Sequence, residues 1–280
     1  MSSNDLNETF PGLDAVNGFY TPFYMQEMFP GNVDKACERW KGLPADERPA
    51  YRVRAQRRTY ATVVNNDRDL LVEDAIREFL DGLLASLGYD RDDDDAAVTF
   101  DLTRLDAHTG VEIPVYMQAV DAHGRPLLQV LASFDDEADS GILESPVDEA
   151  GHTCEECARM LLADFDDAPR WVLAVGLHQA VLIDRRKWAD RQCMIIDFDT
   201  VFSRNETHVY EAVAVLLHRS SLCPDDGESV LDSFDDESSR QAVTVSESLR
   251  SALRECVEIL GNEVIHDWTV NRHRDRKSVV

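Results

Sequence analysis

Three consecutive strand-like runs constrain the fold of this chain more than any other feature. Residues 98–104 alternate between apolar and polar side chains, residues 111–120 form a longer run, and residues 127–134 are almost entirely apolar. The connectors at 107–110 and 121–124 both end in glycine and are typical of turns. The pattern therefore predicts a three-stranded antiparallel meander.

Helices are expected on both sides of this meander. Residues 67–87 carry apolar side chains at helical spacing, and Gly88 stands where such a helix would end. A second helix is expected near 147–165, after an acidic linker at 135–152. The sequence predicts an α/β fold with flanking helices and a mixed sheet, which three further apolar runs complete at 171–175, 179–183 and 194–198.

The ends of the chain differ from this middle part. Residues 1–50 are rich in aromatic side chains and in Pro-Gly pairs, and we expect an irregular arm with a short helix near Val33–Trp40. Residues 51–200 form the expected α/β domain. Residues 201–268 have helical apolar spacing and predict a helical connector, and residues 269–280 are a polar tail.

The order α–βββ–α–β resembles that of PD-(D/E)xK-type nucleases. Such enzymes need an Asp on one central strand and an acid-x-Lys pair on the next, which hold Mg²⁺ and position a water molecule. In the corresponding run 126–132, Gln129 occupies the acid position and Leu131 the lysine position. No lysine lies between Lys41 and Lys187. The sequence thus predicts a degenerate nuclease-like core without its catalytic set.

Two other groups of carboxylates could hold a metal ion. A nuclease with a non-standard site would have to use residues such as Asp101, Glu112 and Asp121. This enzyme remains an alternative, and metal-dependent DNA cleavage would distinguish it. Asp197 and Asp199 also suggest a metal site, but alternating acids on a solvent-facing strand explain them as well, and we favour that interpretation.

One cysteine cluster has metal-ligand spacing. His152, Cys154 and Cys157 form an H-x-C-x-x-C pattern, which would need Cys193 or Cys223 as a fourth zinc ligand. No second C-x-x-C pair is present. Since the two cysteines fall three residues apart on an expected helix, we favour buried core thiols and expect no metal.

The chain lacks the segments that direct proteins out of the cytoplasm. No run approaches the roughly 18 apolar residues needed to cross a membrane, and residues 1–10 have neither a basic start nor an apolar stretch. The six cysteines are mostly scattered through apolar segments, as in a reduced compartment. We expect a cytoplasmic protein without membrane partners.

The formal net charge is −26, and only four of the 28 basic side chains are lysines. A salt-adapted cytoplasm would explain both observations through a dispersed acidic surface. A GC-rich genome would explain the preference for arginine but not the acids. An acidic interaction protein that mimics DNA is a third possibility, although it would need its acids ordered along one face.

One arginine cluster stands out against this acidity. Tyr51, Val53 and Ala55 alternate with polar residues and predict an extended segment with arginines along one side. The cluster could contact phosphates, with Tyr51 or Tyr60 stacking on a base. Salt bridges to the protein's own acids are the simpler interpretation, and we favour it. The arginines are Arg52, Arg54, Arg57 and Arg58.

Two stretches together resemble a known family. One comprises residues 169–176 and 181–188; the other comprises residues 216–229 and 237–249. They look like the N-terminal region of type IIG restriction–modification adenine-specific DNA methyltransferases and of the related methyltransferases in BREX- and DISARM-like phage defence. The resemblance covers roughly residues 50–265, and its motifs are structural rather than catalytic.

The resemblance implies a non-catalytic module that helps position DNA or partner subunits. In the family, a methyltransferase domain and a target-recognition domain follow, and S-adenosylmethionine is the cofactor. Neither a glycine-rich cofactor loop nor an Asn-Pro-Pro-Tyr motif occurs here, so we expect no cofactor in this chain. The sequence stops in a basic stretch after Trp268, and we expect a truncated or split gene product or an isolated module.

Overall fold

The computed structural model divides the chain into two compact units, Met1–Asp235 and Asp236–Val280. Side chains are described as far as Trp268. The structure describes residues 9–65, 72–91, 97–106, 108–135, 141–163, 167–224 and 228–275.

A seven-stranded mixed sheet forms the centre of the first unit, with the strand order β1-β7-β6-β5-β4-β3-β2. β4 and β5 pair in parallel, and the other described pairs are antiparallel. The predicted meander is confirmed as β2-β3-β4. The strands are β1 (Leu13–Val16), β2 (Val98–Leu105), β3 (Glu112–Val120), β4 (Pro126–Ala132), β5 (Trp171–Val175), β6 (Gln179–Asp184) and β7 (Cys193–Asp197).

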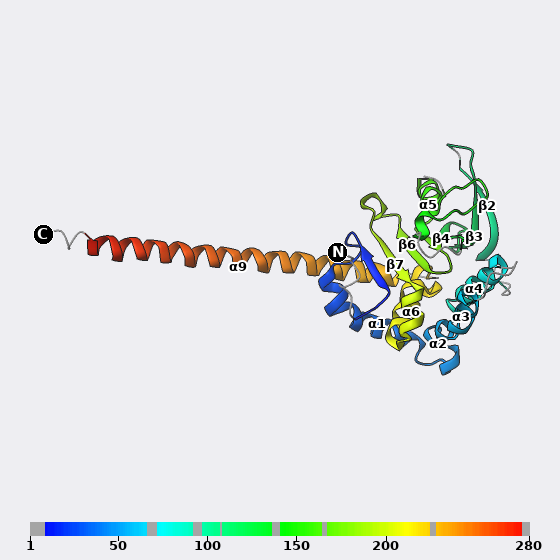
Figure 1. Ribbon diagram of the computed structural model, residues 1–280, viewed down its shortest axis with the longest axis horizontal. Coiled ribbons are helices and arrows are strands. Elements are labelled where there is room, and N and C mark those ends of the chain that lie inside the picture. Colours follow the sequence, from blue (N-terminus) through cyan, green and yellow to red (C-terminus); the bar gives the residue numbers. More distant parts are fainter. Residues whose placement is uncertain are drawn as a thin grey trace. The chain divides into compact units, whose positions relative to one another are not determined.

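Helices cover both faces of this sheet because its central strands are apolar on both sides. In β5, Leu173 faces a larger core while Val172 and Ala174 face a smaller one. α5 (Cys154–Ala163) and the short helix Ile142–Glu144 cover the smaller core, and Figure 1 shows α5 across the sheet from α4 and α6. The larger core is covered by α1 (Phe29–Cys37), α2 (Pro49–Ala55), α3 (Arg57–Val64), α4 (Val72–Ser86), α6 (Phe198–Arg204), α7 (Thr207–Leu217) and α8 (Arg219–Leu222).

The β2-β3 hairpin changes faces halfway along its length. Phe100 packs against the larger core, but Leu102, two residues later, packs against the smaller one. Their cross-strand partners Met117 and Val115 change sides in the same way. Asp101 lies between, with a left-handed φ of 54°, and this conformation rotates the strand. The hairpin therefore contributes to both cores.

Residues 9–50 are more regular than the predicted arm, and the short helix expected near 33–40 is found as α1 and the short helix Glu38–Trp40. β1 pairs with β7 at one edge of the sheet, and α1 begins at Phe29. Aromatic side chains draw this segment into the larger core, where Phe19, Tyr20 and Tyr24 are buried together with Phe29. Residues 9–50 are thus an integral part of the first unit.

The predicted helical connector is also corrected. Apart from the partly buried Glu211, α7 is apolar and buried from Val209 to Leu217, so it is a central helix of the first unit. The last part of the predicted connector forms one helix, α9 (Val230–Asp275), which continues into the predicted tail at 269–280. No described helix is long and apolar enough to cross a membrane.

Candidate nucleic-acid interface

The arginine cluster lies on helices α2 and α3, not on the extended segment that the alternation predicted. Pro49 occupies the first turn of α2, where its missing N–H costs no hydrogen bond. Val53, Tyr60 and Val63 are buried at helical spacing, and α2 packs against α7. Burial along this stripe, rather than the alternation around Val53, determines the local structure.

All four arginines of this cluster are exposed. The Arg54 Nε donates to the Asn205 Oδ1 at 3.0 Å, and the Arg57 Nε donates to the Phe202 carbonyl oxygen at 2.8 Å. Both acceptors are uncharged. Among the residues that the structure describes, none of the four forms an ion pair with a carboxylate, so the predicted salt bridges to the protein's own acids are not found there. We call Arg52, Arg54, Arg57 and Arg58 the arginine face.

Some arginines elsewhere in the first unit pair with carboxylates, whereas Arg48, for example, also donates to uncharged acceptors. Arg125 pairs with Asp121 at 2.7 Å, and Arg186 pairs with Asp232 at 2.9 Å. Arg191 also reaches a carboxylate, that of Glu155. Acidic partners are therefore available on this surface, and the arginine face is set apart from them.

The two tyrosines beside the cluster have different environments. Tyr51 is 54% exposed and precedes Arg54 and Arg58 by about one and two helical turns. Tyr60 is buried, and its hydroxyl donates to the Asp199 carboxylate. Burial and this carboxylate raise the pKa of Tyr60 above its ordinary value. Tyr51 alone is therefore placed to stack on a base.

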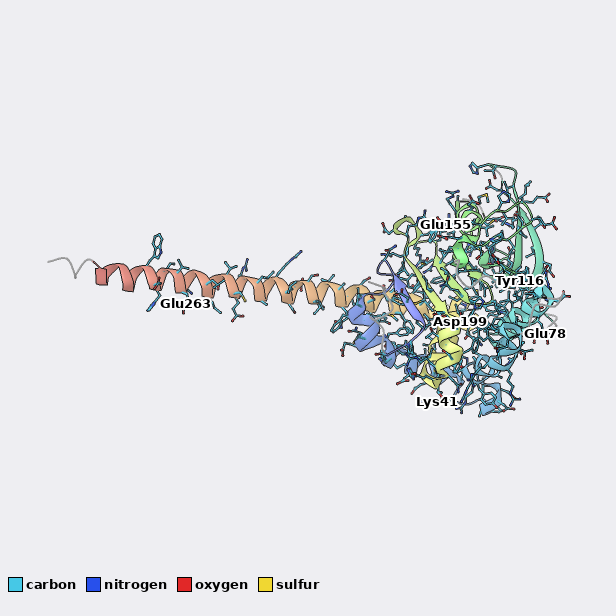
Figure 2. All side chains as sticks on the ribbon, viewed as in Figure 1. Lys41, Glu78, Tyr116, Glu155, Asp199 and Glu263 are labelled. Carbon is cyan, nitrogen blue, oxygen red and sulfur yellow. The ribbon has the colours of Figure 1, made fainter. Side chains whose placement is uncertain are left out.

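Asp197 and Asp199 do not alternate along a solvent-facing strand. Asp197 caps α6, accepting from the Thr200 backbone N–H at 3.0 Å. Asp199 lies in the first turn of α6, where Figure 2 labels it, and its Oδ2 is 2.9 Å from the His178 Nδ1. Asp197 thus stabilises the start of α6, and Asp199 links α6 to Tyr60 of α3 and to His178 of the β5-β6 turn.

The cysteine cluster has the environment of core thiols. Cys154, Cys157 and Cys193 lie in the smaller core, whereas Cys223 lies in the larger core across the sheet. Burial raises the pKa of Cys154 and of Cys157 to about 12. The His152 Nδ1 lies 2.6 Å from the Asp148 Oδ2. In the described ranges, no three His, Cys, Asp or Glu side chains are grouped to hold a metal ion.

The positions that correspond to a nuclease site lie in the interior. Gln129 is fully buried, and its Nε2 donates to the Oε1 of Gln118 on the neighbouring strand at 2.7 Å. Leu131 belongs to the smaller core beneath α5. These two side chains pack the sheet and provide no charge.

The three carboxylates of the alternative nuclease site lie far apart. Glu112 begins β3 and Asp121 follows its other end, which separates them by roughly 30 Å at about 3.3 Å per residue. Asp121 accepts from the backbone N–H groups of its own turn, and Asp101 pairs with Arg91. Asp101, Glu112 and Asp121 cannot share one metal ion.

Sequence reasoning missed an ionic network around Arg170. The Arg170 Nε and Nη2 each donate to the buried Asp184 at 2.9 Å, and Nη2 also donates to Asp232 at 2.8 Å. Lys187 pairs with Asp235 at 2.5 Å. The network fixes the first residues of α9, Val230–Asp235, within the first unit. Pairing between residues 62 positions apart leaves no local signal in the sequence.

The comparisons with known proteins add no relative. No family model, no curated protein and no solved structure matches this chain.

Proposed function

We propose that this chain is a non-catalytic module of a restriction–modification or phage-defence DNA methyltransferase, and that it contacts the DNA backbone through the arginine face. One observation carries the DNA-binding part: four exposed arginines, on a protein of net charge −26, have no carboxylate partner among the described residues. Guanidinium groups that are not neutralised internally are available to phosphate oxygens.

The arrangement of helices and strands supports the nuclease-like part of the proposal. α4, β2-β3-β4, α5 and β5 follow the α–βββ–α–β order, with α4 and α5 on opposite faces of the sheet. A buried Gln129 and a core Leu131 at the catalytic positions favour a fold retained for positioning. The dispersed Asp101, Glu112 and Asp121 give the nuclease alternative no support.

α9 supports a role for partner domains. Between Leu249 and Val264, five large apolar side chains recur every three or four residues and are each more than half exposed. A long apolar stripe of this kind commonly marks a protein–protein contact. A methyltransferase or target-recognition domain is the partner that the proposal assigns to it. The stripe includes Leu249, Leu253, Val257, Leu260 and Val264.

Binding to labelled DNA tests the proposal. Fluorescence anisotropy at low salt should show that the full chain binds both duplex and single-stranded oligonucleotides. Replacing all four arginines of the arginine face by Ala should abolish most of the affinity. Replacing Arg125, Arg159, Arg186 and Arg240, which lie outside α2 and α3, removes the same charge and should change it little. Equal losses would reduce the effect to net charge alone.

Assays of catalysis test the second part of the proposal, that this chain is non-catalytic. The chain should neither transfer a methyl group from S-adenosylmethionine nor cleave DNA with Mg²⁺. Cleavage abolished by Asp121→Ala would restore the nuclease alternative. Inhibition of an unrelated nuclease, without DNA binding, would instead favour the acidic DNA mimic.

A further inference from the structure

The apolar stripe of α9 has an 11-residue period. Leu249 and Leu260 lie 11 residues apart, as do Leu253 and Val264, and Val257 lies between them. Eleven residues fill about three helical turns, so a stripe of this period runs almost parallel to the axis of a straight helix. Figure 1 shows α9 as a straight helix. The stripe therefore presents a continuous line of large side chains along one side of the helix.

This stripe needs a partner surface. Its five side chains are between 56% and 67% exposed, and every residue from Val243 to Trp268 is exposed. A helix in water draws most of its stability from the packing of its apolar face. Long exposed apolar patches mark interaction sites. The surface that fits this stripe is itself a straight, elongated apolar line.

The stripe is symmetric about its own midpoint. Measured from the middle of the Cys256–Val257 pair, Leu253 and Leu260 lie 3.5 residues away on either side, and Leu249 and Val264 lie 7.5 residues away. When two copies of α9 pair antiparallel about this point, Leu249 of one copy faces Val264 of the other. A two-fold pairing requires this reciprocity, in which residue i contacts j and j contacts i. The spacing therefore fits a second copy of the same helix.

Charged side chains beside the stripe favour the same direction. Arg254 and Glu258 lie on one flank of the stripe, one turn apart and on opposite sides of its midpoint. Antiparallel pairing brings equal flanks together, so Arg254 of each copy faces Glu258 of the other. Parallel pairing brings opposite flanks together, and the other flank carries Glu263, so Glu258 would meet a like charge. Charge complementarity thus selects the antiparallel pair.

We propose that two copies of this chain pair antiparallel along the apolar stripe of α9, centred on Cys256–Val257. The inference goes beyond the proposed function and concerns the chain by itself: where a methyltransferase or target-recognition domain does not cover the stripe, a second copy does. It does not depend on DNA contact, because the arginine face lies on α2 and α3. Two chains of net charge −26 repel each other, so salt that screens this repulsion strengthens the pairing.

The mass of the full chain in solution tests the pairing. Sedimentation equilibrium in about 1 M sodium chloride, where the Debye length is about 3 Å, should give twice the chain mass of 31.6 kDa. Replacing Leu253 and Leu260 by Lys puts charges within the stripe and should give the mass of a single chain. Replacing Ser248 and Ser251 by Lys adds the same charge on the other side of α9 and should keep the doubled mass. A doubled mass for the stripe variant overturns the proposal.

Disulfide cross-linking tests the direction of the pair. In a Cys256→Ser background, chains with Leu249→Cys are mixed with chains with Val264→Cys and oxidised. Antiparallel pairing predicts a disulfide between positions 249 and 264 in the mixture and no cross-link in either variant alone. Cross-links in either variant alone, or none in the mixture, overturn the antiparallel arrangement.

DNA binding separates this proposal from the proposed function. A wild type with the mass of a single chain overturns the pairing and leaves the stripe to a partner domain, while anisotropy still reads the arginine face. A doubled mass without DNA binding supports the pairing and contradicts only the DNA contact.

Discussion

Two buried polar side chains in neighbouring parts of the sheet differ in how fully they are paired. Asp184 accepts two hydrogen bonds from Arg170 and one from the Arg186 backbone N–H. Gln129 uses its Nε2 but leaves its Oε1 without a partner among the described residues. A buried charge is tolerated only when it is paired, so Asp184 depends on Arg170 more than any surface acid depends on its partner.

Removing Arg170 should therefore be costly. Arg170→Leu leaves Asp184 and Asp232 without their main cation, and we expect the free energy of unfolding to fall by about 3–5 kcal/mol. Urea denaturation measures this loss. The matched change Arg125→Leu removes an exposed pair and should cost less than about 1 kcal/mol. Similar losses in both variants would contradict a structural role for the network.

His218 should make stability depend on pH over a defined interval. Its pKa is about 4 in the folded chain and 6.5 as an ordinary side chain. Below pH 6.5 the unfolded chain takes up a proton that the folded chain refuses, so stability falls as pH decreases toward about 4. In His218→Asn, which can still cap α8, urea denaturation should show a weaker fall over this interval. An unchanged pH profile would count against a buried neutral His218.

Tyr51 should contribute to binding single strands. Stacking of one base on an aromatic ring is worth about 1–3 kcal/mol, so Tyr51→Ala should weaken single-strand affinity by roughly 5- to 150-fold. Tyr51→Phe should retain most of it. Phe23 is also exposed but precedes α1, and Phe23→Ala serves as the control in the same anisotropy assay. A loss confined to Phe23→Ala would place the contact elsewhere.

At the scale of elements, the sequence predicted the central sheet well, but it missed β1 and predicted an extended segment where α2 lies. Six strands follow the predicted runs within two residues, because buried strands leave long apolar or alternating patterns. β1 is too short to leave such a pattern. The sequence predicted an extended segment at α2 because Arg52 and Arg54 alternate with Tyr51 and Val53. Of these four residues, only Val53 is buried.

Close packing between α4 and the α2–α3 junction should fix the arginine face. A Cβ on Gly82 of α4 would lie 2.6 Å from the Gln56 side-chain oxygen. Gly82→Leu overpacks this contact, and we expect a loss of about 1–3 kcal/mol in urea denaturation, with weaker DNA binding. Gly31 of α1 has open space around it, so Gly31→Ala should stabilise the protein by about 0.5–1 kcal/mol. A neutral Gly82→Leu would contradict tight packing there.

At the scale of the whole molecule, charge opposes and directs DNA binding at once. A net charge of −26 repels phosphate, so weak binding is expected wherever basic side chains are already paired. The arginine face groups four exposed arginines that have no carboxylate partner among the described residues. Salt screens both the general repulsion and the local attraction. Screening the repulsion raises the affinity, whereas screening the attraction lowers it, so the salt dependence of binding distinguishes the two.

The slope of log affinity against log salt tests the central claim most directly. Each phosphate neutralised on duplex DNA adds about 0.9 to that slope. Replacing Arg52, Arg54, Arg57 and Arg58 by Ala should therefore flatten it by up to about 3 to 4, whereas the fourfold control at Arg125, Arg159, Arg186 and Arg240 should leave it unchanged. An equal slope for the wild type and the arginine-face variant would show that these arginines do not contact DNA.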